Sequence, residues 1–252
     1  MRSTPVSREP FRHCDENRVA VVLVAHGSRD PRAAAATSAL ARAVRLARPD
    51  WDVYPSYLDH AGPRPLDVLA SLGRRRAVVV PLLLTAAYHG RVDVPAVLEA
   101  ARALPVEVSL ADVLGPVSPL LLDALLRRLG DPGLDAVVLA AAGTRDAAAR
   151  ATVEEAAAAL GARLGVPSAV AYASAAPPTA GAAVERLRAH GARRVAVASY
   201  FLAPGLLHDV AVESALAAGA VAVAAPMTDA PELVRLVEAR VGGVRGARLL
   251  AA

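Results

Sequence analysis

Apolar runs alternate along the chain with Ala-rich stretches that carry spaced charges. Residues 19–25 (VAVVLVA), 77–84 and 136–142 contain no charge, which is typical of strands buried on both faces of a parallel sheet. The expected strands are residues 19–25, 52–57, 77–84, 106–110 and 136–142, and the expected helices of the first half are 33–47, 64–73, 96–104 and 118–129. Strands that alternate with helices predict an α/β fold with doubly wound parallel sheets.

The second half of the sequence repeats the first at an offset of 116 residues. Val21–Asp30 and Val137–Asp146 share Val-Val-Leu and Ala-x-Gly-[Ser/Thr]-Arg-Asp, and the same offset lays Asp93 on Asp209. Internal duplication explains this match better than chance does. We therefore expect two similar lobes with a cleft between them. The expected division is a flexible tail at 1–18, an N-terminal lobe at 19–130, a C-terminal lobe at 131–241 and a second tail at 242–252.

Three polar side chains of the first lobe have no counterpart in the second. At the offset of 116, Ala142 stands opposite His26, Gly205 opposite His89, and Ala175 opposite Asp59. All three polar residues follow expected strands, at the edge where open α/β sheets bind ligands. Both lobes would need these groups if they served folding, so the asymmetry favours a single functional site in the first lobe.

Composition and charge exclude several classes of protein. The net charge is only +4, and the basic residues, all Arg, are dispersed without a nucleic-acid-binding motif, so we expect no nucleic-acid partner. The single cysteine, Cys14, excludes internal disulfides and cysteine-based metal clusters. No charge-free apolar run approaches the roughly 18 residues of a membrane span. Residues 1–18 do not resemble a signal peptide, so the expected location is the cytoplasm.

His26, Asp59 and His89 can together bind a divalent transition metal and leave positions open on it. The two histidines can instead accept protons, since imidazole titrates near neutral pH. Each residue also has a structural interpretation: a strand-end histidine can cap a backbone group, and Asp59 can cap the following helix. His60 is expected at the surface or behind the metal ligands.

Other polar residues have expected roles outside the catalytic centre. Asp30 and Asp93 recur in the second lobe, so helix capping and loop bracing are expected of them. Surface positions are expected for the remaining histidines, His13, His190 and His208.

Residues around the two histidines can receive an anionic substrate. Arg29 and Arg91 flank them and can pair with carboxylates. The backbone N–H groups of Gly27 and Ser28, at an expected helix start, can also receive an anion.

Three motifs stand out in the first half of the chain: His-Gly-Ser-Arg-Asp-Pro after a buried strand, Tyr-Leu-Asp-His-x-x-Pro, and Val-Pro-Leu-Leu-Leu-x-x-x-Tyr-His-x-x-x-Asp-Val-Pro. Together they resemble the sirohydrochlorin chelatase family, which includes the cobalt-inserting chelatases among the class II chelatases. The likeness covers residues 19–241 in the long, two-lobed form. By motif position, His26 and His89 resemble the family's active-site histidines, and Tyr88 lies beside the latter. Asp59 falls where the family commonly has Glu, and the shorter Asp would hold a metal about 1.5 Å further back.

The resemblance implies insertion of a divalent metal into a tetrapyrrole, sirohydrochlorin, without ATP, for sirohaem or cobalamin synthesis. Fe²⁺ and Co²⁺ are the expected metals, Ni²⁺ is a further candidate, and no other cofactor is expected. His26 and His89 would accept the two pyrrole protons or hold the metal, with Asp59 as a further ligand. The expected partners are the tetrapyrrole and the metal, with no membrane, and a duplicated lobe predicts a monomer.

Three alternatives compete with the chelatase interpretation. A histidine phosphatase also carries His-Gly after a strand, but it has Arg before the histidine where this chain has Ala25. A non-catalytic tetrapyrrole or metal carrier would need the same site. A two-lobed binding protein of the periplasmic type would need an export signal, which residues 1–18 lack.

Overall fold

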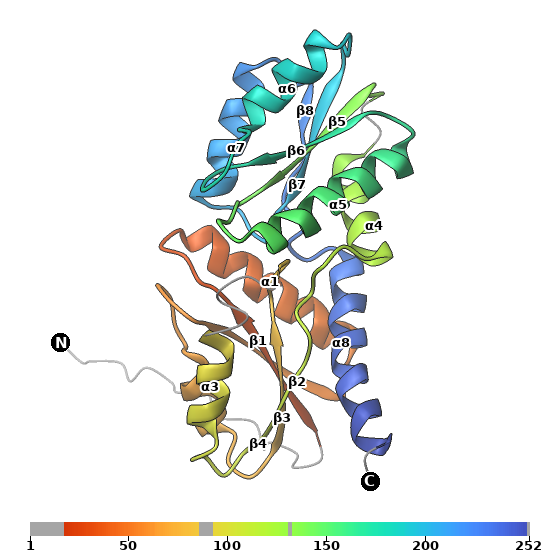
Figure 1. Ribbon diagram of the computed structural model, residues 1–252. Helices are drawn as coiled ribbons and strands as arrows, with labels where there is room; N and C mark the ends of the chain where they lie inside the picture. The colour runs from red at the N-terminus through yellow and green to blue at the C-terminus, as the bar shows by residue number, and fades with distance from the viewer. Residues whose placement is uncertain (1–17, 86–92, 131–132, 251–252) are drawn as a thin grey trace, which may run out of the picture.

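The chain forms two lobes, each built on a four-stranded parallel sheet (Figure 1). The computed structural model describes residues 18–85, 93–130 and 133–250. The first sheet has the order β2-β1-β3-β4, with β1 at Val19–Ala25, β2 at Trp51–Tyr57, β3 at Arg76–Pro81 and β4 at Glu107–Leu110. The second has the order β6-β5-β7-β8, with β5 at Ala136–Ala141, β6 at Ser168–Tyr172, β7 at Val195–Tyr200 and β8 at Ala222–Val223. The predicted fold class is confirmed.

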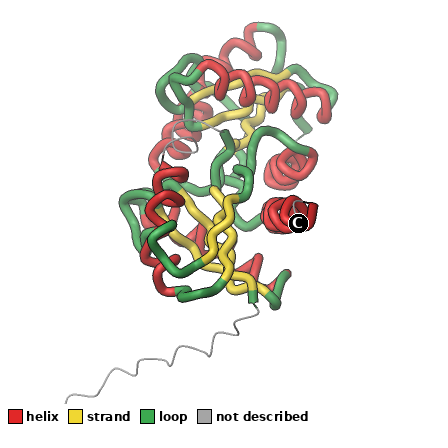
Figure 2. Tube along the Cα trace, turned by 60° about the horizontal axis from the view of Figure 1, so that its bottom comes forward, coloured by secondary structure: helices red, strands yellow, loops and turns green. Residues whose placement is uncertain are grey.

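Helices cover both faces of each sheet (Figure 2). Their bounds are α1 (Pro31–Ala47), α2 (Pro65–Ser71), α3 (Val94–Ala101), α4 (Pro119–Leu129), α5 (Ala147–Leu164), α6 (Ala180–Ala189), α7 (Leu206–Ala217) and α8 (Pro231–Leu250). Several starts agree with the capping rules: Asp30 caps α1 by accepting a hydrogen bond from the Arg32 N–H, with Pro31 next to it. The predicted capping role of Asp30 is therefore confirmed. Asp93 stands before α3, but its side chain makes no capping hydrogen bond.

The first apolar run is the central strand of its sheet. β1 pairs in parallel with β2 on one side and with β3 on the other, and residues 20–24 are at most 1% exposed. β5 occupies the same position between β6 and β7. A strand with neighbours on both edges and helices on both faces has no contact with water, which explains why its sequence carries no polar alternation.

The difference in residue number between equivalent positions of the two lobes changes along the chain. Gly27 corresponds to Gly143, at the offset of 116. Each glycine lies against the loop after the neighbouring strand: an added Cβ would meet the carbonyl oxygen of Asp59 at Gly27, and that of Ser174 at Gly143. Asp59 therefore corresponds to Ser174, at an offset of 115, and the match of Asp59 with Ala175 is wrong by one residue. The strand register agrees with this shift, because Val21 pairs with Val53 whereas its counterpart Val137 pairs with Ser168.

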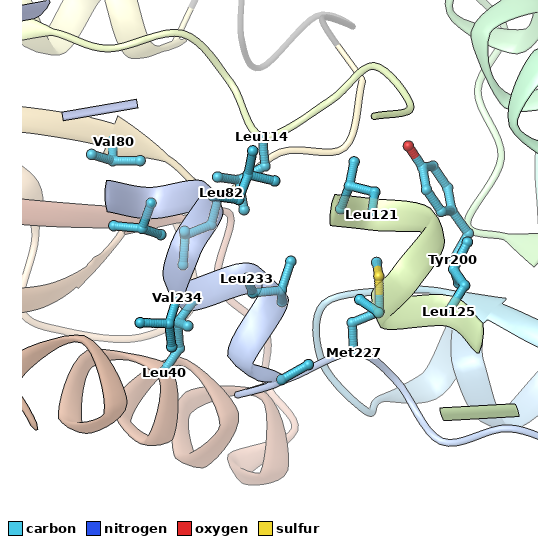
Figure 3. Close-up of a cluster of buried hydrophobic side chains, with 14 of the residues drawn as sticks. Leu40, Val80, Leu82, Leu114, Leu121, Leu125, Tyr200, Met227, Leu233 and Val234 are labelled. Carbon is cyan, nitrogen blue, oxygen red and sulfur yellow. The ribbon is translucent and has the colours of Figure 1, made fainter. Parts of the chain in front are cut away.

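The last helix of each half packs on the other lobe. α4 contacts β7 and α5 of the second lobe, whereas α8 returns to the first lobe and contacts α1 and β3 (Figure 1). As a result, one buried apolar cluster runs through both lobes (Figure 3), and includes Leu40, Val80, Leu82, Leu114, Leu121, Leu125, Tyr200, Met227, Leu233 and Val234. Each fully buried Leu contributes about 1.5–3 kcal/mol to stability. The two lobes are therefore held together by the apolar side chains that they bury against each other.

The helix α8 extends through Leu250, although a tail was expected from residue 242. Its apolar stripe continues with helical spacing, because Leu233, Val237 and Val241 are buried and Val244 packs against the same core. This stripe outweighs the adjacent glycines Gly242 and Gly243. No helix among the described residues combines the length and the apolar character that a membrane crossing requires.

Candidate functional site

The candidate site lies between the lobes, at the carboxyl ends of the strands. His26 follows β1 directly, is exposed, and lines three adjoining cavities with volumes of about 170, 280 and 680 Å³. The second lobe supplies the opposite walls, with Ala142 after β5 and Phe201 after β7. His26 is thus the first-lobe side chain at which these cavities meet, as its position after a buried strand predicts.

The strand pairing continues past β1 and brings the end of β2 beside His26. The Leu58 N–H donates to the carbonyl of Ala25 at 3.0 Å, and the Asp59 N–H donates to the carbonyl of His26 at 2.8 Å. Two predicted site residues, His26 and Asp59, are therefore adjacent through their main chains. The third metal-ligand candidate, His89, lies outside the described residues, as do Tyr88 and Arg91.

The Asp59 carboxylate is engaged by its own neighbours. Oδ1 accepts a hydrogen bond from the His60 N–H at 2.8 Å and lies 3.6 Å from Nη2 of Arg64, and Oδ2 lies 3.4 Å from Nε2 of His60. The His60 N–H, with the charges of His60 and Arg64, lowers the pKa of Asp59. The helix-capping alternative for Asp59 is wrong, because Arg64 occupies the N-cap position of α2.

His60 is exposed, as the expected surface position predicts, and its ring also lies beside that of His26. Its imidazole is T-shaped to that of His26, with ring centroids 6.4 Å apart and an interplanar angle of 86°. Both rings line the cavity of about 680 Å³. The backbone of His60 is left-handed, with φ at +59°, which determines the direction of its side chain. The available signal was the sequence position: His60 corresponds to Ala175 once the offset of 115 is applied.

The residues after His26 build the start of α1. Gly27 has φ at +94°, and the Ser28 hydroxyl accepts a hydrogen bond from the Asp30 N–H at 3.0 Å. Arg29 is exposed and lines the cavity of about 680 Å³, where it can meet an anionic ligand. Substrate binding by Gly27, Ser28 and Arg29 stays a prediction.

The second lobe closes the cavity with an apolar wall and one histidine. Leu206, at the start of α7, is 73% exposed and lines the cavity of about 680 Å³. His208 also lines it, but its side chain is only 11% exposed, 5.4 Å from the Phe201 ring and 3.2 Å from the Ser199 hydroxyl. The expected surface position of His208 is therefore wrong, because α7 turns this residue towards β7. His190 is exposed, as predicted, and His13 lies outside the described residues.

Polar contacts connect the lobes beside the cavities. Arg32 on α1 pairs with Asp30 and, across the lobes, with Asp209 on α7, each at 2.5 Å. The Arg32 guanidinium lowers the pKa of both carboxyl groups. Tyr200 donates from its hydroxyl to the carbonyl of Leu84 at 3.4 Å, and burial raises its pKa. The recurring aspartate Asp209 therefore bridges the lobes.

The described residues contain no group of three or more His, Cys, Asp or Glu side chains placed to hold a metal ion. His26 and His60 provide a pair of imidazoles, and the third predicted ligand, His89, belongs to residues 86–92, which the structure does not describe. The metal set of His26, Asp59 and His89 stays a prediction. In chemical terms, the described site offers imidazole nitrogens, a nearby carboxylate and an apolar wall.

Comparisons with known proteins match the chain to one family model and to solved structures of the same fold. A family model described as CbiX matches residues 20–131 and again residues 136–243. No curated protein matches the sequence. Among solved structures, SirB from Bacillus subtilis with Fe³⁺ has a TM-score of 0.76 and 21% identity, over 90% of this chain and 95% of that one.

Two further solved structures share the fold. The sirohydrochlorin chelatase SirB from Bacillus subtilis subspecies spizizenii in complex with cobalt has a TM-score of 0.71 and 21% identity, over 90% of this chain and 95% of that one. CbiX, described as the terminal enzyme for biosynthesis of sirohaem in denitrifying bacteria, has a TM-score of 0.64 and 19% identity, over 90% of this chain and 98% of that one.

Proposed function

Since the chain belongs to the CbiX family, we propose that it inserts a divalent metal ion into sirohydrochlorin without ATP. Fe²⁺ and Co²⁺ are the candidate metals, which would lead to sirohaem or to a cobalamin precursor. The names of the similar structures, with Fe³⁺ and with cobalt, support both metals. A cytoplasmic location and a monomeric state remain predictions of the sequence.

The observation that carries the proposal is the position of His26, where three cavities between the lobes meet. A tetrapyrrole is a flat, largely apolar ring with charged groups at its rim. The walls suit such a ring: Leu82, Tyr200 and Phe201 line the cavity of about 280 Å³, and Leu206 and Leu207 line that of about 680 Å³. Small residues at the end of β5, Ala141, Ala142 and Gly143, line the cavity of about 280 Å³ and leave room beside His26.

The chemistry requires a base and a place for a partly hydrated metal. Insertion releases two pyrrole protons, and a neutral imidazole at His26 can accept one or hold the incoming ion by its nitrogen lone pair. The apolar walls exclude water, which helps to strip the ion before it enters the ring. The predicted second base, His89, would act in the same way from the undescribed segment.

The rim of the substrate carries carboxylates, for which Arg29 is the candidate partner. Its side chain is exposed at the cavity of about 680 Å³. A guanidinium forms paired hydrogen bonds with a carboxylate. Such a pair would orient the tetrapyrrole ring and increase its affinity for the site.

Anaerobic absorption spectroscopy tests this function. The purified chain is mixed with sirohydrochlorin and excess Fe²⁺ or Co²⁺ in turn, beside a control without protein. We expect many molecules of the free base to be converted per molecule of protein, at a rate that ranks the metals. A bound-ligand spectrum that never turns over would contradict the proposal and favour a carrier.

A further inference from the structure

We propose that His60 is a metal ligand that shares the ion with His26, and that Asp59 positions the His60 ring. This assignment rests on the proposed function, because it concerns the metal at the same site. The expected ligands were His26, Asp59 and His89. In this assignment the loop after β2 supplies His60 as the ligand in place of Asp59.

The separation of the two rings fits a shared ion. A nitrogen ligand lies about 2.1 Å from a metal and about 1.2 Å from the centre of its ring, so each centroid would be about 3.3 Å from the ion. Two such rings have centroids about 4.7 Å apart at right angles and about 6.6 Å apart on opposite sides. The observed 6.4 Å falls within this range, towards its upper end.

The carboxylate of Asp59 is placed to support His60. Its Oδ1 already holds the His60 N–H, and its Oδ2 lies 3.4 Å from the His60 Nε2. A carboxylate on one ring nitrogen fixes the tautomer of a histidine and leaves the other nitrogen to the metal. The Asp59 carboxylate is one methylene closer to the backbone than a glutamate carboxylate would be. The imidazole of the adjacent His60 extends further from the backbone than this carboxylate does.

The internal repeat separates the role of the loop from that of the side chain. The equivalent residue of the second lobe, Ala175, has φ at +65°, close to the +59° of His60. The left-handed backbone therefore belongs to the loop in both lobes, and only the first lobe places an imidazole on it. Likewise Ser174 stands where the first lobe has Asp59, and it donates to the Ala142 carbonyl instead.

This repeat supplies substitutions that the fold already accommodates. H60A and D59S install the residues of the second lobe at equivalent positions. H60N is a second variant, because asparagine tolerates the left-handed region. H190A is the matched control, since His190 is exposed at the end of α6 and its Nδ1 hydrogen-bonds the Arg186 carbonyl. All are made in the full-length chain.

The test is titration of the metal-free chain with Co²⁺ alone, followed by its visible absorption spectrum. We expect H60A and H60N to weaken Co²⁺ binding at least tenfold and to change the spectrum. D59S should weaken binding roughly tenfold while it keeps the spectrum, because the ligands remain but one is no longer held in place. H190A should leave both unchanged.

The assignment is overturned if H60A and H60N bind Co²⁺ with the affinity and spectrum of the unaltered chain. A spectrum that changes in D59S but not in H60A would also overturn it, because Asp59 would then be the ligand. The titration contains no tetrapyrrole, so it is independent of turnover. A chain that binds Co²⁺ through His60 yet fails to metallate sirohydrochlorin would refute the proposed function alone.

Discussion

Gly27 lies so close to Asp59 that a Cβ at position 27 would be 1.8 Å from the Asp59 carbonyl oxygen. Gly27 also has φ at +94°, a conformation that side chains rarely adopt. The second lobe repeats this contact between Gly143 and Ser174, at 1.9 Å. The close approach brings the loop that follows β2 against the end of β1, and so places His60 beside His26.

Replacement of Gly27 should therefore destabilise the fold and displace the site. G27A has to move the Asp59 backbone or lose its hydrogen bond to the His26 carbonyl, in addition to the cost of about 1–2 kcal/mol for the left-handed backbone. We expect a loss of more than about 3 kcal/mol in the free energy of unfolding, measured by urea denaturation.

The matched control for G27A is G73A. Gly73 has φ at +62°, but nothing lies within 4 Å of the position that an added Cβ would take there. Its loss should be limited to the backbone cost of about 1–2 kcal/mol. Equal losses in the two variants would show that the contact with Asp59 contributes nothing.

The pair between Glu232 and Arg127 should make stability depend on pH. Glu232 on α8 is 2% exposed and accepts hydrogen bonds from Nε and Nη2 of Arg127 on α4, at 2.8–3.0 Å. This contact lowers the pKa of Glu232. We expect E232Q to reduce the free energy of unfolding by about 1–1.5 kcal/mol at neutral pH, because the amide oxygen can still accept from Arg127 but lacks the charge that strengthens the hydrogen bond.

The sign of the pH effect follows from the lowered pKa. The contribution of Glu232 is present above the pKa of an unfolded glutamate, about 4.3, and is lost as the pH falls through the lower pKa of the folded state. The difference between the native chain and E232Q should therefore shrink below about pH 4 in thermal unfolding. E99Q, in an exposed pair with Arg102, is the control and should change little at any pH.

The sheets and the repeat could be predicted from the sequence, because their signals are local. β1 and β5 are apolar throughout, and the motif around Gly27 recurs around Gly143. The partners of α4 and α8 could not be predicted in this way. An amphipathic stripe shows which face of a helix is buried, but not which sheet covers it, and here each helix crosses to the other lobe.

The site could be predicted in outline, with His26 in its expected place. The sequence places His60 at the surface or behind the metal ligands, because no local pattern shows how close its ring lies to that of His26. The direction of the His60 side chain depends on φ at +59°, which is unusual for a residue other than glycine. His208 is misplaced for a related reason: its burial depends on how α7 meets Phe201.

Removal of the Arg29 guanidinium should weaken substrate binding with little effect on the chemical step. We expect R29A to raise KM for sirohydrochlorin about tenfold, with kcat nearly unchanged, because one carboxylate partner is lost equally in the ground and transition states. The equivalent second-lobe residue, Arg145, does not line the cavities at His26, so R145A is the control. An equal rise in both variants would assign the effect to net charge.

Replacement of His26 should abolish most turnover while the fold is retained. H26A installs the alanine that the second lobe carries at Ala142, so the thermal unfolding midpoint should stay near that of the native chain. The rate of metallation should fall at least about 100-fold, because a proton acceptor or metal ligand at the centre of the cavities is lost. H89A should have the same effect if the undescribed segment supplies the second histidine, and H190A should have none. Near-normal rates in both H26A and H89A would contradict a metallation site at this edge, whereas a loss in H26A alone would leave His60 as the histidine that completes it.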